Sequence, residues 1–79
     1  MYYVYILQSL NTPEHFYVGI SCDLNKRLAQ HNDGMSVHTN KFKPWKIRTA
    51  IRFDDSSKAE KFEKYLKSSS GRAFAKKHF

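Results

Sequence analysis

Two short segments near the start of the chain alternate apolar side chains with tyrosines, and a polar loop separates them. Residues 2–7 and 16–20 are rich in β-branched and aromatic residues, and the loop between them contains Asn11 and Pro13. A period of two is typical of strands that bury one face, and asparagine and proline are typical of turns. The sequence therefore predicts an antiparallel hairpin, which any fold of this chain has to accommodate.

The apolar residues of the two predicted strands also indicate a register. Because side chains alternate between the two faces of a strand, the buried residues of one strand should face the buried residues of the other. The register then contains two facing apolar pairs, Val4 with Val18 and Ile6 with Phe16. It also places Tyr5 and Tyr17 together on the opposite face, so the hydrophobic pattern predicts two neighbouring phenols.

A helix is predicted directly after the hairpin. Asp23 can cap its first turn, and the helix should run to about residue 31 or 32, where Gly34 is placed to end it. Its apolar stripe consists of Leu24 and Leu28. Arg27 and His31 are four residues apart, so they should lie one helical turn apart beside that stripe.

The second half of the chain contains four further patterns. Residues 35–45 show no clear period and predict a loop, whereas residues 47–53 alternate and predict a third strand. Residues 57–60 match a capping box, which would open a helix that stops around residues 68–71. That helix would bury three side chains: Ala59, Phe62 and Leu66. The basic segment 72–79 predicts a short terminal helical piece.

The order of these elements and the length of the chain indicate the fold class. The chain has 79 residues, of which 41% are hydrophobic and 15% aromatic, and this is enough for one modest core. We therefore expect a single domain over residues 1–79 with an α/β fold of the α+β kind. It would contain a small three-stranded, mainly antiparallel sheet flanked by helices, in the order β-β-α-β-α-α.

The net charge indicates an anionic partner. Fourteen Lys and Arg against seven Asp and Glu give a net charge of +7, and such a field attracts polyanions such as nucleic acid. A basic protein with no special partner is the alternative explanation. The candidate phosphate contacts are Lys26, Lys41, Lys43 and Lys67. Residues 41–46 interleave basic and aromatic side chains, which suits stacking on bases, although Phe42 and Trp45 could instead cover the core.

A lone cysteine and the lack of long apolar runs limit the expected environment. Cys22 is the only cysteine, so no disulfide can form within the chain, and this fits a reducing compartment. No apolar run approaches the length of a membrane span, and residues 1–10 lack the basic start of a signal peptide. We therefore expect a cytoplasmic protein with no membrane partner and no disulfide partner.

Four side chains in the first part of the chain could form a phosphate site. Arg27 borders a buried stripe, where its guanidinium can present two N–H groups to a phosphate. His31, one turn later, can face the same ligand, although a histidine near a helix end can also simply stabilise that end. Tyr5 and Tyr17 could be ordinary strand residues, but a shared face brings their hydroxyl groups together.

Glu63 is the most informative acid in the chain. On a helical wheel it lies beside the predicted apolar stripe, whereas Glu60 lies further out. Glu63 could form an ion pair with Lys67, which follows four residues later. A single carboxylate is also sufficient for a magnesium ion that keeps most of its waters and takes phosphate oxygens from a substrate. No histidine or cysteine pair has the spacing of a zinc site.

In their order along the chain, these residues resemble the GIY-YIG nuclease family. Tyr3-Val4-Tyr5 stands where the family has Gly-Ile-Tyr, and Tyr17-Val18-Gly19 stands where it has Tyr-Ile-Gly. Arg27 and His31 resemble the family's helix arginine and the histidine one turn later. Glu63 resembles the family's metal-binding glutamate.

Other residues resemble one branch of that family. The run His31-Asn32-Asp33-Gly34, followed by Thr39 and Pro44-Trp45, is similar to the small stand-alone bacterial branch. Two features depart from the family pattern: the first motif keeps only its tyrosine, and no residue matches the asparagine that some members place near the end. We expect no extra DNA-binding domain of the kind that many relatives carry, which leaves the target sequence open.

The resemblance implies a metal-dependent endonuclease that hydrolyses phosphodiester bonds in DNA, rather than RNA, in DNA repair or processing. It implies that Glu63 holds Mg²⁺ or Mn²⁺ and that Arg27 stabilises the developing negative charge. Tyr5 or Tyr17 would activate water, aided by His31. Two other functions stay compatible with the sequence: a basic nucleic-acid-binding module with a degenerate site, and a structural component of an RNA–protein assembly.

Overall fold

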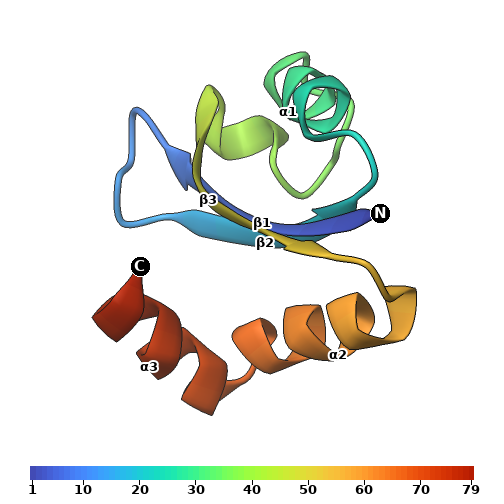
Figure 1. The fold of residues 1–79 in the computed structure, drawn as a ribbon. Coiled ribbons are helices and arrows are strands. Elements are labelled where there is room, and N and C mark those ends of the chain that lie inside the picture. Colours follow the sequence, from blue (N-terminus) through green and yellow to red (C-terminus); the bar gives the residue numbers. More distant parts are fainter.

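The computed structural model describes residues 1–79 as a three-stranded antiparallel sheet with helices on both faces. The elements in chain order are β1 (Tyr2–Ser9), β2 (Phe16–Ser21), α1 (Leu24–Asn32), a 3₁₀ turn η1 (Asn40–Phe42), β3 (Trp45–Phe53), α2 (Ser56–Lys67) and α3 (Ser69–His78). The strands follow the order β2-β1-β3, so the first strand of the chain is the central one. In Figure 1, α1 lies above the sheet, and α2 and α3 lie below it. The predicted α+β class and element order are confirmed.

The hairpin forms as predicted, but its register differs by two residues. Val4 lies opposite Ile20 and Ile6 lies opposite Val18, whereas the prediction paired Val4 with Val18 and Ile6 with Phe16. A shift of two residues keeps every side chain on its predicted face. The hydrophobic pattern cannot distinguish the two registers for that reason.

Gly19 gives a physical reason for the observed register. It lies opposite Tyr5, and a Cβ atom at this position would overlap the Tyr5 ring and hydroxyl group. The phenol therefore lies across the backbone of β2, where only glycine leaves enough room. Tyr5 and Tyr17 still share one face, with their ring centroids 6.4 Å apart, but they lie diagonally rather than directly opposite each other.

The third strand begins two residues earlier than predicted, at Trp45. Asn32 at the end of α1 holds this extension, because its side chain donates to the Trp45 carbonyl at 3.1 Å and accepts from the Trp45 N–H. A bulge between Ile6 and Leu7 interrupts the pairing with β1. Trp45 is 4% exposed, so it belongs to the core and not to a nucleic-acid surface.

Both ends of α1 are as predicted. The Asp23 carboxylate accepts a hydrogen bond from the Lys26 N–H at 3.0 Å and caps the first turn. Gly34 follows the last turn with a φ of 76°, in the left-handed region that favours glycine. These two ends fix α1 over the sheet, with Arg27 and His31 one turn apart.

One prediction about local structure was wrong and one was incomplete. Residues 35–45 form a loop as predicted, except that Asn40–Phe42 make the single turn η1, which is too short to leave a period in the sequence, and Trp45 begins β3. The predicted capping box at residues 57–60 does not form, since the cap of α2 is Asp55. The Asp55 carboxylate accepts the Ser57 N–H at 2.8 Å and so starts the helix at Ser56.

The corner between α2 and α3 is tighter than predicted. Ser68 ends α2 and also caps α3, because its hydroxyl accepts the Gly71 N–H at 3.1 Å. As a result α3 begins at Ser69, and not at residue 72. Gly71 is buried against the carbonyl group of Tyr65, where a Cβ atom would overlap the backbone.

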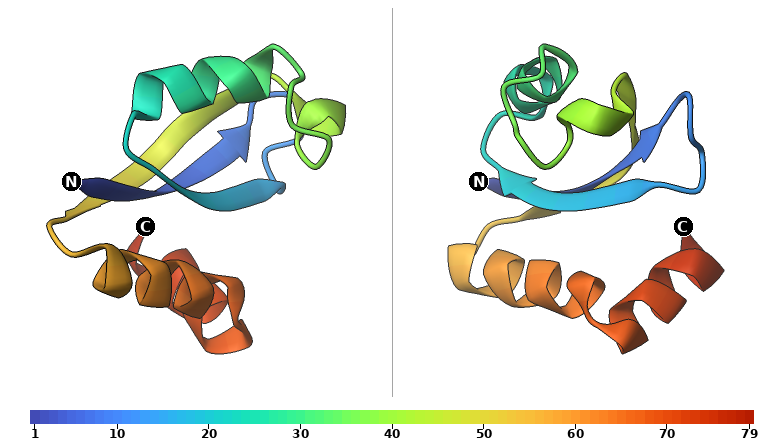
Figure 2. Two further views of the ribbon diagram at one scale, coloured as in Figure 1. Left: turned by 90° about the vertical axis from the view of Figure 1, so that its right-hand side faces the viewer. Right: turned by 180° about the vertical axis from the view of Figure 1, so that it is seen from behind.

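Two apolar cores occupy the two faces of the sheet. The core under α2 and α3 consists of Val4, Ile6, Ala59 and Leu66, with Phe62 packed against it. The core under α1 consists of Tyr5, Leu7 and Trp45, covered by Leu24 and Leu28. Both views in Figure 2 show the sheet between these two helical layers. None of the helices combines the length and apolarity that crossing a membrane requires.

Candidate active site

Three of the side chains singled out in the sequence are joined by hydrogen bonds on the α1 face of the sheet. Tyr5 in the central strand is 1% exposed, and its hydroxyl oxygen lies 3.1 Å from Nε2 of His31. Arg27 donates from Nε to the same oxygen at 3.3 Å. Helix α1 supplies both partners, because residues four apart project from one side of a helix. The phenol thus lies between a guanidinium and an imidazole.

A fourth residue, Thr39, extends these contacts into the core. His31 is fully buried, and its Nδ1 lies 2.7 Å from Oγ1 of Thr39. The Thr39 carbonyl in turn accepts the indole N–H of Trp45 at 2.9 Å. Sequence reasoning gave Thr39 no role in the site, because it lies in the segment without a period. The only signal was its place in the run that resembles the bacterial branch.

Burial and a neighbouring charge keep His31 neutral. Desolvation lowers the pKa of His31 below its usual value, and the positive charge of Arg27 lowers it further. A neutral imidazole has one donor nitrogen and one acceptor nitrogen. Arg27 donates to the Tyr5 oxygen, and the Tyr5 hydroxyl has an acceptor when it donates to Nε2, which leaves Nδ1–H to donate to Thr39. These contacts link Arg27, Tyr5, His31 and Thr39 in one hydrogen-bonded row.

The phenol of Tyr5 is held in its protonated form. Burial raises the pKa of Tyr5, the hydrogen bond and charge of Arg27 oppose this rise, and the nearby Tyr17 and Glu63 add to it. The hydrogen bond with Tyr5 also raises the pKa of Arg27, which stays positively charged. At neutral pH, Tyr5 is consequently protonated and can donate a hydrogen bond.

Tyr17 is the more accessible of the two phenols. It is half-buried on the edge strand β2, and its ring centroid lies 5.0 Å from that of His31. The Nζ atom of Lys67 lies 5.9 Å from the centre of the Tyr17 ring. The two phenols are therefore neighbours in different surroundings, Tyr5 inside the protein and Tyr17 at the edge of the sheet.

Glu63 approaches the same edge from α2, on the other face of the sheet. Its side chain is 19% exposed, and Oε2 lies 3.4 Å from Nζ of Lys67. The ion pair that the sequence offered as an alternative is therefore present. Glu63 is also close enough to Tyr5 for its negative charge to raise the pKa of the phenol. Its position thus suits both a surface ion pair and a place in the site.

A divalent ion at this place would have one ligand from the protein. No group of three or more His, Cys, Asp or Glu side chains comes together in the structure. Such a site does not fit zinc, which takes four ligands and prefers nitrogen and sulfur. It fits magnesium, which keeps several waters and binds through one or two carboxylates together with phosphate oxygens of a substrate. Glu63 is the acid whose charge reaches the Tyr5 phenol.

The lysines singled out in the sequence lie in different places. Lys67 pairs with Glu63 and lies near the Tyr17 ring. Lys26, Lys41 and Lys43 are exposed, on α1 and around η1, and Lys41 lies with Nζ 5.6 Å from the centre of the Phe42 ring. Sequence reasoning missed three cations that line a groove next to Tyr17: Arg48, Arg72 and Lys76. Arg72 and Lys76 are four residues apart, and this spacing was the signal that could have revealed these two.

The comparison with known protein families agrees with this arrangement. Residues 1–77 match the family described as the GIY-YIG catalytic domain. The chain belongs to the GIY-YIG family. The resemblance inferred from the order of the motifs is confirmed, and the match extends from β1 into α3.

Two bacterial proteins are among the relatives of this GIY-YIG chain. A UPF0213 protein of Cupriavidus necator is 36% identical over 77 residues, which cover 92% of this chain and 82% of that protein. The UPF0213 protein YsiG of Lactococcus lactis is 36% identical over 67 residues, which cover 84% of this chain and 62% of that protein. The aligned region thus spans less than two thirds of the Lactococcus protein.

Membership of the GIY-YIG family indicates a nuclease-type domain that binds nucleic acid. GIY-YIG nucleases are generally dependent on a divalent metal. The small size of the bacterial relatives is consistent with a stand-alone branch, but their names carry no information on ion, substrate or pathway. The chemistry of this chain therefore has to be argued from its own side chains.

Proposed function

We propose that this chain is a divalent-metal-dependent endonuclease that hydrolyses phosphodiester bonds in DNA in the cytoplasm, in repair or processing. One observation carries the proposal: a guanidinium and an imidazole contact the Tyr5 phenol, the Tyr17 ring lies beside the rings of Tyr5 and His31, and the charge of Glu63 reaches the same phenol. They come from four separate elements, β1, β2, α1 and α2. Buried hydrogen bonds between Tyr5, Arg27 and His31 could be purely structural. What favours a reactive site is that Tyr17 and Glu63, both partly accessible to solvent, lie near the same Tyr5 phenol.

Arg27 is placed to stabilise negative charge on a phosphate. Its Nε donates to Tyr5, and its Nη1 donates to Gln30 at 3.0 Å. A guanidinium has five N–H donors in one plane, so donors are left for phosphate oxygens after these two bonds have fixed its orientation. A donor fixed in advance needs little reorganisation when charge develops in the transition state.

The two phenols have different roles in this proposal. Tyr5 is buried and protonated, so it orients Arg27 and His31 and does not abstract a proton. The position of Tyr17 at the sheet edge favours it as the group that contacts the attacking water. A phenol is a weak base at neutral pH, and hydrolysis must therefore also depend on charge stabilisation around the phosphate.

Glu63 would hold the divalent ion, either Mg²⁺ or Mn²⁺. An ion bound there supplies Lewis-acid polarisation of a phosphate oxygen. The Glu63 carboxylate must first leave its ion pair with Lys67, whose side chain is 50% exposed and can turn toward solvent or toward the substrate phosphate. An ion pair with one partner open to solvent is worth on the order of 1 kcal/mol, so this release is a small obstacle.

The substitution Glu63→Gln tests the proposed function. It removes the charge and keeps the shape, so we expect loss of Mg²⁺-dependent nicking of supercoiled plasmid. The melting temperature and the DNA affinity measured in EDTA should stay close to those of the wild type. The matched control is Glu60→Gln, on the exposed face of the same helix, which should cut at the wild-type rate. Wild-type cutting by Glu63→Gln would refute the assignment.

The ion pair between Glu63 and Lys67 favours a second candidate function, a nucleic-acid-binding module without catalysis. In that case Lys67 neutralises the acid permanently, and the 3.4 Å contact fully accounts for Glu63. Plasmid assays with Mg²⁺ and with Mn²⁺ separate the two candidates. DNA binding in EDTA with no nicking in either ion would support the binding module.

A further inference from the structure

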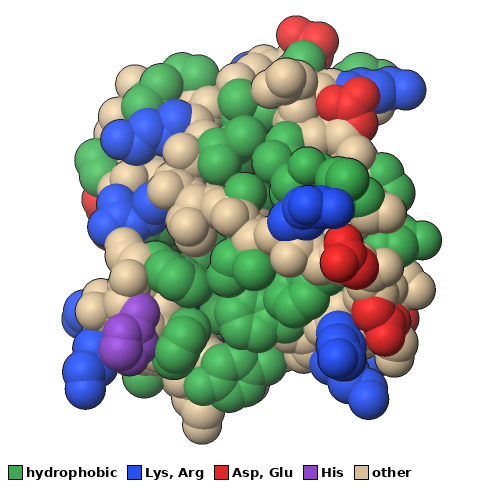
Figure 3. Space-filling view, viewed as in Figure 1, with side chains coloured by type: hydrophobic (Ala, Val, Ile, Leu, Met, Phe, Trp, Pro, Cys, Tyr) green, Lys and Arg blue, Asp and Glu red, His purple; other side chains and the backbone are tan.

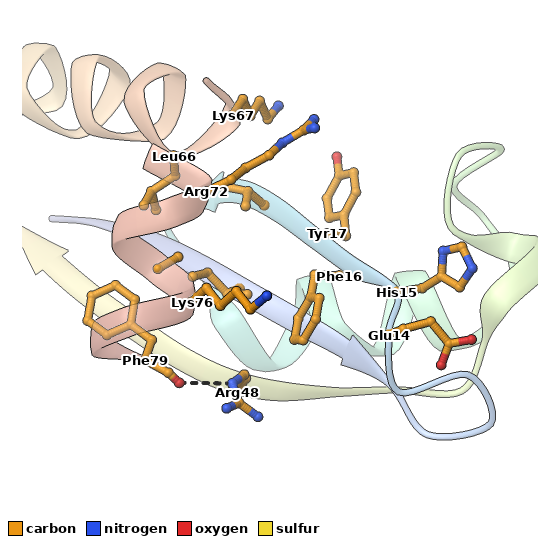
Figure 4. A pocket seen from close by; sticks show the side chains of 13 residues that line it. Glu14, His15, Phe16, Tyr17, Arg48, Leu66, Lys67, Arg72, Lys76 and Phe79 are labelled. Carbon is orange, nitrogen blue, oxygen red and sulfur yellow. Dashed lines mark hydrogen bonds between the residues drawn. The ribbon is translucent and has the colours of Figure 1, made fainter. Parts of the chain in front are cut away.

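A groove opens next to Tyr17, between the β2 edge of the sheet and α3, with a volume of about 850 Å³. Figure 4 shows its side chains. Apolar side chains of Val18, Leu66 and Ala75 line part of it. The charged side chains that line it are four cations and one acid: Arg48, Lys67, Arg72, Lys76 and Glu14. The groove is therefore strongly basic with an apolar lining.

The groove also contains an exposed aromatic ring that packs into neither core. Phe16 lies on the edge strand β2, and 51% of it is exposed. The guanidinium carbon of Arg48 lies 5.8 Å from the centre of this ring. In Figure 4, the side chain of Lys76 extends toward Phe16, and those of Arg72 and Lys67 extend toward Tyr17. Cations that follow a groove, together with an open aromatic ring, are the combination that binds unpaired nucleic acid.

We propose that this groove binds an unpaired segment of single-stranded DNA that leads to the bond to be cut. Lys67, Arg72 and Lys76 would contact its phosphates, and Phe16 would stack on a base. The proposal rests on the proposed function, because it places the scissile bond at Tyr17. Tyr17 and Lys67 belong both to the groove and to the candidate active site, which makes the two continuous.

The chemistry of the groove favours an unpaired strand over a duplex. In a duplex the bases are stacked on one another, and a side chain reaches a base face only after the base leaves the stack. Phe16 could therefore stack only on an unpaired base. A duplex would need cations alone, and neither the exposed ring nor the apolar lining would contribute to its binding.

Binding of a single strand can be measured in EDTA, where no cleavage takes place. The probes are a fluorescein-labelled oligothymidylate and a blunt duplex of the same length, followed by fluorescence anisotropy at several salt concentrations. Arg72→Ala/Lys76→Ala should weaken oligothymidylate binding about tenfold and lower its salt slope by about 1.4, or about 0.7 for each phosphate contact. Duplex binding should change by less than about threefold.

The matched control is Lys58→Ala/Lys61→Ala, which removes the same charge from exposed positions of α2 that do not line the groove. It should change oligothymidylate binding by less than about twofold. Phe16→Ala should weaken it about fivefold or more through lost stacking, whereas Phe16→Trp should retain it. Melting curves of all variants verify that the fold is kept.

The outcomes for the groove and for the nuclease function are separable. Unchanged oligothymidylate binding in the Arg72→Ala/Lys76→Ala variant overturns the proposal that the groove binds single-stranded DNA, even if the wild type nicks plasmid. Equal losses for single strand and duplex overturn it as well. Selective loss of oligothymidylate binding supports single-strand binding in the groove. If the wild type also shows no nicking, only the proposed nuclease function fails.

Discussion

Tyr5 and Tyr17 carry the same functional group in different surroundings. Tyr5→Phe should leave Nε2 of the buried His31 without a partner, which costs about 1–3 kcal/mol of unfolding free energy. Tyr17→Phe removes a hydroxyl group from a half-exposed ring and should change the unfolding free energy by less than about 0.5 kcal/mol. Urea denaturation measures both values.

The same two variants separate structure from chemistry. Under the proposed function, Tyr17→Phe should lower the rate of plasmid nicking by roughly two orders of magnitude while its stability is kept. Tyr65→Phe provides a control, since Tyr65 is 40% exposed on α2 and lines neither the site nor the groove. Full activity in Tyr17→Phe would exclude its hydroxyl from proton transfer.

His31 links the stability of the fold to pH. Its pKa is lowered in the folded state, so between that value and the unfolded value of about 6.5 the unfolded chain binds more protons. The unfolding free energy should therefore fall as the pH drops through this window and should level off above it. Denaturation curves from pH 5 to pH 8 measure the slope. His31→Gln should flatten it, whereas His38→Gln, at an exposed position, should not; equal slopes in both variants would contradict the assignment.

At the scale of elements, local patterns predicted the strands and helices well. The period of two, the cap at Asp23 and the stop at Gly34 each depend on a few neighbouring residues, and all three are observed. The register could not be predicted in this way, because it depends on the contact between Gly19 and Tyr5 across two strands.

The candidate site shows the same division between local and long-range information. The Arg27 and His31 pair follows from helical spacing, and the shared face of the tyrosines follows from strand alternation. Thr39 could not be found from a local pattern, because it reaches His31 from a segment that has none. The basic groove was missed because β2, β3 and α3 each supply part of it.

The cap of α2 provides a direct test at this scale. Asp55→Ala should cost about 1 kcal/mol of unfolding free energy, because the Ser57 N–H loses its side-chain acceptor. Ser57→Ala should cost less than about 0.5 kcal/mol, because its hydroxyl caps nothing in the structure. Urea denaturation of the two variants decides between the observed cap and the capping box expected from the sequence. A larger loss for Ser57→Ala would restore the capping box.

At the scale of the whole molecule, the chain carries a net charge of +7. In Figure 3, lysines and arginines surround a broad apolar area of the face shown, and acidic side chains lie among them on one side. The groove beside Tyr17 concentrates four of the cations. Position, and not the total charge, should therefore decide which cations bind nucleic acid.

Lys41 and Lys43 test this view away from the groove. Under the nucleic-acid function, Lys41→Ala and Lys43→Ala should each weaken binding to all duplex sequences alike. Each should lower the salt slope by about 0.9 for every phosphate contact that is lost. Anisotropy titrations with two unrelated duplexes, and Lys58→Ala as the control, measure both effects. A DNA affinity that does not change with ionic strength would contradict the nucleic-acid function, because a cationic protein releases counterions when it binds a polyanion.

The acid and the hydrogen-bonded trio are anchored in separate cores on opposite faces of one sheet. A small tilt of α2 would move Glu63 and leave the bonds of Tyr5 to Arg27 and His31 untouched. Under the proposed function, substitutions in the α2 layer can therefore silence or restore cutting while the α1 layer keeps its shape. Under the proposed function, a chain with this fold could therefore gain or lose catalysis with no change in its architecture.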